Sequence, residues 1–94
     1  MKESELSATQ KAVIEKIRVL MREYVITRRP SFLYTQEELL RNIEKDLKSL
    51  DEEYIKEYKI PKDVVNNIAR EIYDALMKKS QHDRAITLAE HYKI

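Results

Sequence analysis

The sequence predicts a small all-α domain of four to five helices. The chain of 94 residues contains no glycine, although about six or seven would be usual at this length. Without glycine, the positive-φ turns of tight hairpins and phosphate-binding loops are unfavourable. Apolar residues make up 43% of the chain and recur at helical spacing, which favours amphipathic helices. Both prolines, Pro30 and Pro61, fall between these apolar runs, where helices are expected to stop or start.

A long first helix is expected within residues 1–29. Ser7 and Gln10 form a capping box that starts it, and Pro30 disfavours a helical residue before it, so the helix should end at Arg28 or Arg29. Its apolar stripe is wider than one neighbouring helix covers. The stripe consists of Val13, Ile14, Ile17, Leu20, Met21, Tyr24 and Val25. Two interpretations remain open: Val13, Ile17, Met21 and Tyr24 form a homodimer face, or the whole stripe is core.

Three further helical segments follow a linker over residues 29–34, whose Phe32 should plug one end of the core. A second capping box, Thr35 to Glu38, starts a helix to about Ser49. Ser49 then opens a brief helix through Tyr58, and Pro61 suits the first residue of a helix that fades near Lys79 or Ser80.

The tail over residues 83–94 fits either a short helix or a strand. Leu88 and Tyr92 stand four residues apart, as on one helix face, whereas Ile86 and Leu88 alternate as in a strand. No turn that contains glycine offers a strand its partner, so the helix is favoured.

Candidate catalytic and metal-binding groups are few, and each has a simpler explanation. There is no cysteine, and His82 and His91 stand nine residues apart, which is not a helical metal-ligand spacing. Glu37 and Glu38 lie at an expected helix start, where acidic residues favour the helix dipole. We therefore expect no enzyme activity, metal or cofactor. No apolar run is long enough to span a membrane, and the start of the chain lacks a signal-peptide core, so a cytoplasmic protein is expected.

Residues 51–79 contain a stretch that resembles the helix-turn-helix of DNA-binding proteins. Its apolar positions follow the offsets of that motif: Tyr54, Ile55, Tyr58, Ile60, Val65 and Ile68. The resemblance covers about 20 residues and implies two helices locked at a steep angle, with the second in the major groove. Lys59 occupies the turn position that glycine usually takes, so it must adopt a left-handed backbone or the turn must differ.

The outward face of the second helix supplies the predicted DNA contacts. Asparagine is a poor helix former, so Asn66 and Asn67 in mid-helix call for another explanation. Asparagine pairs bidentately with adenine and arginine with guanine. The predicted DNA-binding residues of this helix are therefore Lys62, Asn66, Asn67 and Arg70, of which the last three are expected to read base edges. Arg28 and Arg29, in a locally basic first helix, are expected to hold phosphates.

Two functions from different classes are compatible with these features. The first is a small DNA-binding regulator of transcription or of plasmid or viral DNA maintenance, acting as a homodimer on double-stranded DNA. The formal charge of +1 excludes a general polyanion binder, so the basic groups would have to gather locally. The second is a helical module that binds and neutralises a protein partner. The chain is similar to bacteriocin immunity proteins in length, helical pattern and charge density, and antitoxins are a comparable class.

Overall fold

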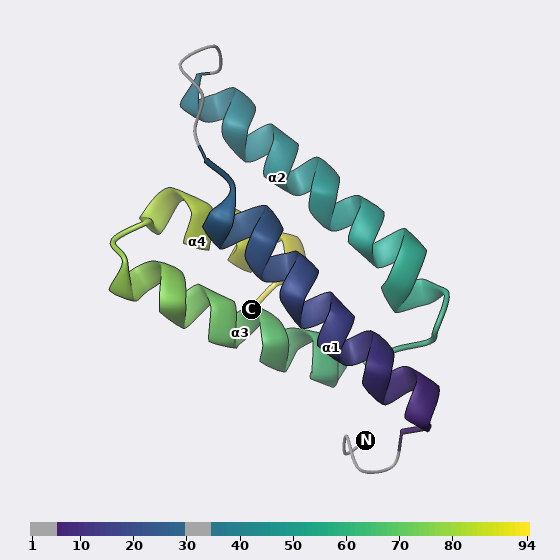
Figure 1. Cartoon of the computed structure of the whole chain (residues 1–94). Coiled ribbons are helices and arrows are strands. Elements are labelled where there is room, and N and C mark those ends of the chain that lie inside the picture. Colours follow the sequence, from purple (N-terminus) through teal and green to yellow (C-terminus); the bar gives the residue numbers. More distant parts are fainter. Residues whose placement is uncertain (1–5, 30–34) are drawn as a thin grey trace.

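The computed structural model describes residues 6–29 and 35–94 and is all-helical over those ranges (Figure 1). Its four α-helices are α1 (Ala8–Arg22), α2 (Gln36–Leu50), α3 (Lys62–Lys78) and α4 (His82–Tyr92). Two π-helical segments extend the first two helices without a break, η2 (Glu23–Thr27) after α1 and η3 (Asp51–Lys56) after α2. The predicted fold class is therefore confirmed as all-α, with four helices. The proposed role of Phe32 lies outside the described residues.

The helices alternate in direction and form a four-helix bundle. α1 packs against α2 and α3, and α4 packs against the same two helices. α2 and α3 are not a packed pair and lie on opposite sides of α1 in Figure 1. The helices that the predicted helix-turn-helix joins are thus diagonal in the bundle.

Both predicted capping boxes are present. The Gln10 amide donates to Ser7 Oγ at 3.1 Å, and the Ser7 amide donates to Gln10 Oε1 at 3.1 Å. Thr35 and Glu38 make the same reciprocal pair at the start of α2. These side chains satisfy amide groups that the helix itself leaves without acceptors, which is why both starts could be located from the sequence.

The prediction of a separate brief helix from Ser49 to Tyr58 is wrong. Leu50 and Asp51 keep helical backbone angles, so α2 passes directly into η3, and Ser49 lies inside the helix and does not cap one. No glycine or proline interrupts this stretch, and buried Leu47 and Leu50 continue the same apolar stripe toward Tyr54. The next helix begins at Lys62, with Pro61 at the N-cap position. The helix predicted for the tail is confirmed as α4.

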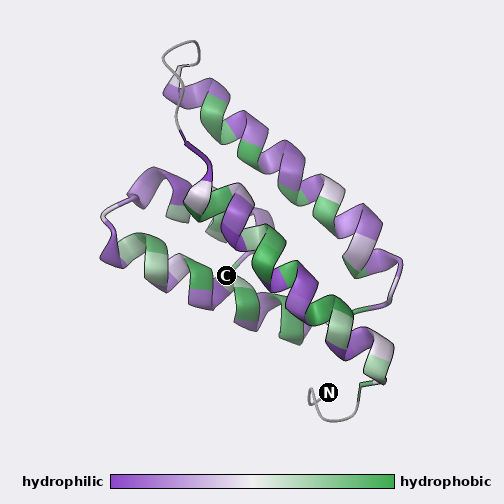
Figure 2. Ribbon diagram, in the orientation of Figure 1, coloured by the Kyte–Doolittle hydropathy of each residue, from purple (hydrophilic) through white to green (hydrophobic). Residues whose placement is uncertain are grey.

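The core lies between the four helices, whose hydrophobic sides face inward while the outer side of α2 is polar (Figure 2). α1 contributes Ile14, Ile17 and Met21, and η2 contributes Val25, all fully buried. The interpretation of Val13, Ile17, Met21 and Tyr24 as an intersubunit face is therefore wrong for Ile17 and Met21, because the other helices of the same chain already cover them. Val13 and Tyr24 are half-buried against the core.

Candidate functional site

The predicted DNA-contacting residues do not form one surface. Lys62, Asn67 and Arg70 are exposed along α3, whereas Asn66 is half-buried and turned toward the end of α4. Arg84, just after the α3–α4 turn, donates to the carbonyl oxygens of Val25 and Ile26. This contact places the end of η2, and hence Arg28 and Arg29, beside the first turn of α4, which follows α3 after a short turn. Lys62 begins α3 at its opposite end.

Arg28 is also engaged within the bundle. Its guanidinium forms an ion pair with Asp46 of α2, and both side chains are about two-thirds to three-quarters covered. A guanidinium held in this way is less available for a phosphate than the exposed Arg29. Of the two arginines predicted to hold phosphates, the structure leaves Arg29 open.

The helix-turn-helix packing is not confirmed. Its proposed first helix is the last part of a continuous helix from Gln36 to Lys56, and it does not pack along α3. Ile60, Val65 and Ile68 are buried as expected, but within the core of the whole bundle. Lys59 does adopt a left-handed backbone, with φ of 53°, so the first of the two alternatives for this turn holds.

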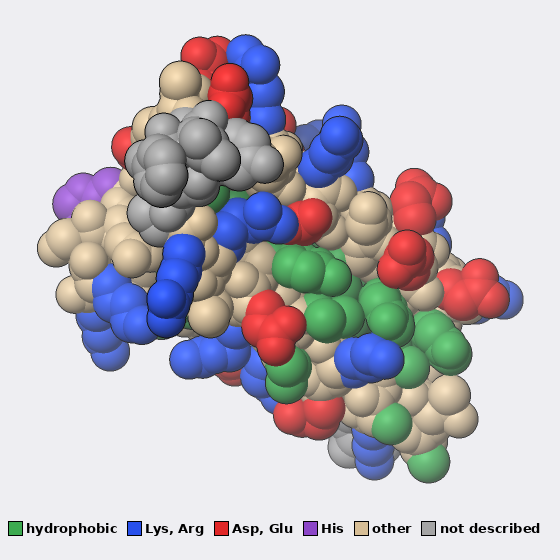
Figure 3. Space-filling view, turned by 45° about the horizontal axis from the view of Figure 1, so that its top comes forward, with side chains coloured by type: hydrophobic (Ala, Val, Ile, Leu, Met, Phe, Trp, Pro, Cys, Tyr) green, Lys and Arg blue, Asp and Glu red, His purple; other side chains and the backbone are tan. Residues whose placement is uncertain are grey.

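Basic side chains gather at the end of the bundle where α3 turns into α4 (Figure 3). The exposed basic residues toward this end are Arg22, Arg29, Lys78 and Lys79, and the exposed Arg70 lies at the middle of α3. They form no ion pair with another described residue. Figure 3 also shows hydrophobic side chains on the face that α1 crosses, where Val19 is 53% exposed.

A second surface lies between α2 and α4, which run in the same direction. At their starts, Gln36 Nε2 donates to Asp83 Oδ2 at 3.3 Å. At the far end, Tyr92 donates its hydroxyl to Asp51 Oδ1 at 2.9 Å. Because the two starts and the two ends are both joined, the outward faces of these helices form one continuous seam.

This acidic seam is a hollow of about 420 Å³ with an apolar centre and a charged rim. Its lining residues are Glu37, Leu40, Arg41 and Glu44 of α2 and Asp83, Ile86, Thr87 and Glu90 of α4. Leu40 and Ile86 supply the apolar centre, and Ile86 is 51% exposed. Four carboxylates surround them against one guanidinium, which is already paired with Glu37 at 2.7 Å.

The two helices line the seam with the same residue spacing. Each has a carboxylate, an apolar residue three positions later and a second carboxylate seven positions after the first. Seven residues advance a helix by about 10 Å. The seam therefore has two acidic zones about 10 Å apart with apolar surface between them. Sequence reasoning missed this site because it explained Glu37 by the helix dipole and could not place α2 beside α4. The repeated spacing of the two helices is the signal in the sequence that could have indicated the site.

A third surface, the lysine groove, lies where η3, the start of α3 and the end of α4 meet. It is a hollow of about 380 Å³ with Ile55, Ile60, Val65 and Asn66 beneath, and Lys56, Lys62 and Lys93 around it. Asp51, His91 and Tyr92 form one wall. His91 Nε2 lies 2.7 Å from Asp51 Oδ2, and Tyr92 bonds the other carboxylate oxygen. Burial, followed by the charge and hydrogen bond of Asp51, raises the pKa of the Tyr92 phenol well above its ordinary value.

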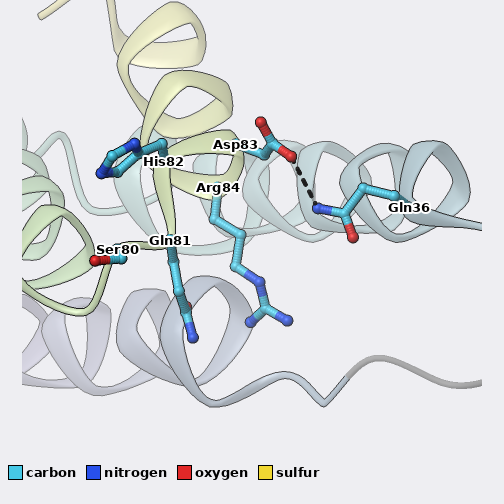
Figure 4. Close-up of a pocket in the computed structure, with 6 residues that line it drawn as sticks. All are labelled: Gln36, Ser80, Gln81, His82, Asp83 and Arg84. Atoms are coloured by element: carbon cyan, nitrogen blue, oxygen red, sulfur yellow. Dashed lines mark hydrogen bonds between the residues drawn. The ribbon is translucent and has the colours of Figure 1, made fainter.

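A polar hollow at the start of α4 is occupied by structural contacts (Figure 4). Gln36 and Asp83 are joined across it, and the side chains of Gln81 and Arg84 extend toward the end of η2. Burial, and to a smaller degree the charge of Arg28, lowers the pKa of the Arg84 guanidinium from its ordinary value. These groups connect three helices to one another.

Within residues 6–29 and 35–94, no group of three or more side chains of the kinds that bind metals is assembled. None of the described helices is long and apolar enough to cross a membrane. No protein family, curated protein or solved structure matched this chain.

Proposed function

We propose that this protein is a helical module that binds a basic, amphipathic helical segment of a protein partner along the acidic seam. The observation that carries the proposal is the half-exposed Ile86, set beside Leu40 within a ring of four carboxylates. A large apolar side chain exposed in such a ring favours a partner that is apolar at its centre and cationic on both sides. Neutralisation of a toxic or regulatory protein is the kind of role that such binding would serve.

The spacing of the seam defines the partner segment. Its cations should stand seven residues apart on one helix face, with a large apolar residue three or four positions after the first. Such a helix would place its cations about 10 Å apart, over the two acidic zones. Its apolar residue would then contact Leu40 and Ile86, which are the candidates for the dominant binding contribution.

The test uses a synthetic helical peptide with two lysines at this spacing and leucine between them, titrated into the full chain and followed by calorimetry and amide NMR shifts. Ile86→Ser should weaken binding at least tenfold, because it removes the apolar contact and leaves the charge of the carboxylate ring unchanged. Val19→Ser is the matched control, since Val19 of α1 is 53% exposed and Ile86 is 51% exposed. Equal affinity of both variants for the peptide, or no binding by the unmodified protein, would contradict the proposal.

A second candidate function, DNA binding, is favoured by the exposed basic residues around the α3–α4 end. Arg29, Lys78 and Lys79 are exposed at this end and Arg70 at the middle of α3, and none of them forms an ion pair with a described residue. If they bind a duplex, affinity should fall steeply as salt is raised. Arg70→Ala should cost about 1–3 kcal/mol on a preferred site, and Arg29→Ala should weaken all duplexes alike. A protein that binds no mixed-sequence duplex at low salt would exclude this function.

A further inference from the structure

The lysine groove contains a polar atom whose hydrogen bonding is incomplete. Asn66 Oδ1 is shielded from solvent, and no donor among the described residues reaches it. Buried amide oxygens are nearly always hydrogen-bonded, because an oxygen without a donor has lost its hydrogen bonds to water and gained none in the protein. Asn66 lines the groove, and rotation about the last side-chain bond of asparagine is soft, so turning the amide over exchanges its oxygen and nitrogen and presents the oxygen to the groove.

The other polar groups of the groove divide into engaged and open ones. Asp51 uses one carboxylate oxygen for His91 and the other for Tyr92, and Lys56 pairs with Glu52 at 2.7 Å. Lys62 and Lys93 are exposed at the rim and pair with no carboxylate that the structure describes. The groove thus offers one acceptor near its floor and two cations at its edge.

Apolar surface fills the space between these open groups. Ile55, Ile60 and Val65 line the groove, and Ile60 and Val65 are largely buried there. A volume of about 380 Å³ is within the range of small-ligand sites, which are mostly apolar with a few convergent polar groups. A flat ring system fits such walls at low entropic cost because it has few rotatable bonds.

We propose that the lysine groove is a binding site for a small aromatic acid that carries an N–H donor, such as an indole carboxylate. The ring packs on Ile55, Ile60 and Val65, and the N–H donates to Asn66 Oδ1. The carboxylate lies between Lys62 and Lys93. The lysine groove shares no lining residue with the acidic seam, so the test of ligand binding here does not depend on the proposed partner binding.

Three probes separate the contributions of ring, donor and charge. Indoleacetate has all three, naphthaleneacetate lacks the N–H, and indoleacetamide lacks the negative charge. Each is titrated into the full chain while amide NMR shifts are followed. We expect the shifts to centre on Ile60, Val65 and Asn66, and indoleacetate to bind about tenfold more tightly than either other probe. Equal affinity for all three, or shifts centred elsewhere, would overturn the proposal.

Two variants with matched controls assign the contacts. Asn66→Leu should abolish the preference for indoleacetate over naphthaleneacetate, whereas Asn67→Leu, at the exposed neighbouring position, should retain it. Lys62→Gln should reduce the preference for indoleacetate over indoleacetamide several-fold, and Lys78→Gln should not. Thermal unfolding of each variant checks that it is folded. A folded Asn66→Leu protein that keeps the full donor preference would show that Asn66 does not contact the ligand.

Discussion

The guanidinium of Arg84 donates from Nη1 to the carbonyl oxygen of Val25 at 3.1 Å, joining the start of α4 to the end of η2. The same nitrogen lies 3.2 Å from the carbonyl oxygen of Ile26. The last carbonyls of a helix have no partner within it, and a cation there also complements the helix dipole. A charged side chain that is only 6% exposed thus completes the hydrogen bonding of a helix 58 or 59 residues away.

Replacing Arg84 with methionine should therefore destabilise the fold. Methionine keeps much of the packing but leaves the Val25 and Ile26 carbonyls without their donor, which should cost about 1–3 kcal/mol. Urea unfolding with an unchanged slope measures this loss. Arg70→Met is the control, because Arg70 is exposed on α3 and its replacement should change stability by no more than about 0.5 kcal/mol. Equal stability of the two variants would mean that the carbonyl contacts contribute nothing.

In the part of the chain that the structure describes, two of the turns between helices hold a residue other than glycine in left-handed backbone. Lys59 has φ of 53° and Ser80 has φ of 59°. A residue with a Cβ atom loses about 1–2 kcal/mol of stability in this conformation. Glycine avoids that loss, but its greater backbone freedom in the unfolded state offsets part of the gain. Lys59→Gly and Ser80→Gly should each stabilise the protein by about 0.5–1 kcal/mol in urea unfolding. Lys45→Gly, within α2, should instead destabilise it by a similar amount.

Helix starts were predictable from the sequence because their determinants are local. Each capping box lies within four residues, and the left-handed turn at Lys59 follows from its place between two helices. The absence of an end at Ser49 was not predictable in this way. The pattern from Ser49 to Glu52 can occur inside a helix as well as at the start of one. Burial of Leu50 in the bundle favours the continuous helix.

The surfaces depend on contacts between distant segments, which the sequence alone does not place. Asn66 follows the pattern of a base-reading residue, but the end of α4 packs near it and makes it part of a groove. An arginine such as Arg84 is expected at the surface from the sequence, and only the fold shows that it is buried beside the carbonyls of η2. The acidic seam arises only when α2 and α4 lie side by side.

The buried phenol of Tyr92 should make stability fall at high pH. Its pKa is raised in the folded protein, so the native state keeps a proton that the unfolded chain loses above about pH 10. Stability from this group is therefore complete below about pH 10 and declines as pH rises further. Urea unfolding at about pH 8 and about pH 11 should show a smaller decline for Tyr92→Phe than for the unmodified protein. Tyr58→Phe, at an exposed position, should decline as the unmodified protein does.

Burial of the α1 stripe predicts that the protein is a monomer. Ile17 and Met21 are fully enclosed by their own chain, so sedimentation at tens of micromolar should give a mass near 11.3 kDa.

Ile17→Asp separates the two interpretations of this helix. At an intersubunit contact it would produce a folded monomer, whereas in this core it buries an unpaired charge and should cost more than about 3 kcal/mol, enough to populate unfolded chains. Val19→Asp, on the exposed side of α1, should remain folded and monomeric. A stable dimer that Ile17→Asp converts into folded monomers would show that the helices separate around this stripe and exchange their own contacts for those of a second copy.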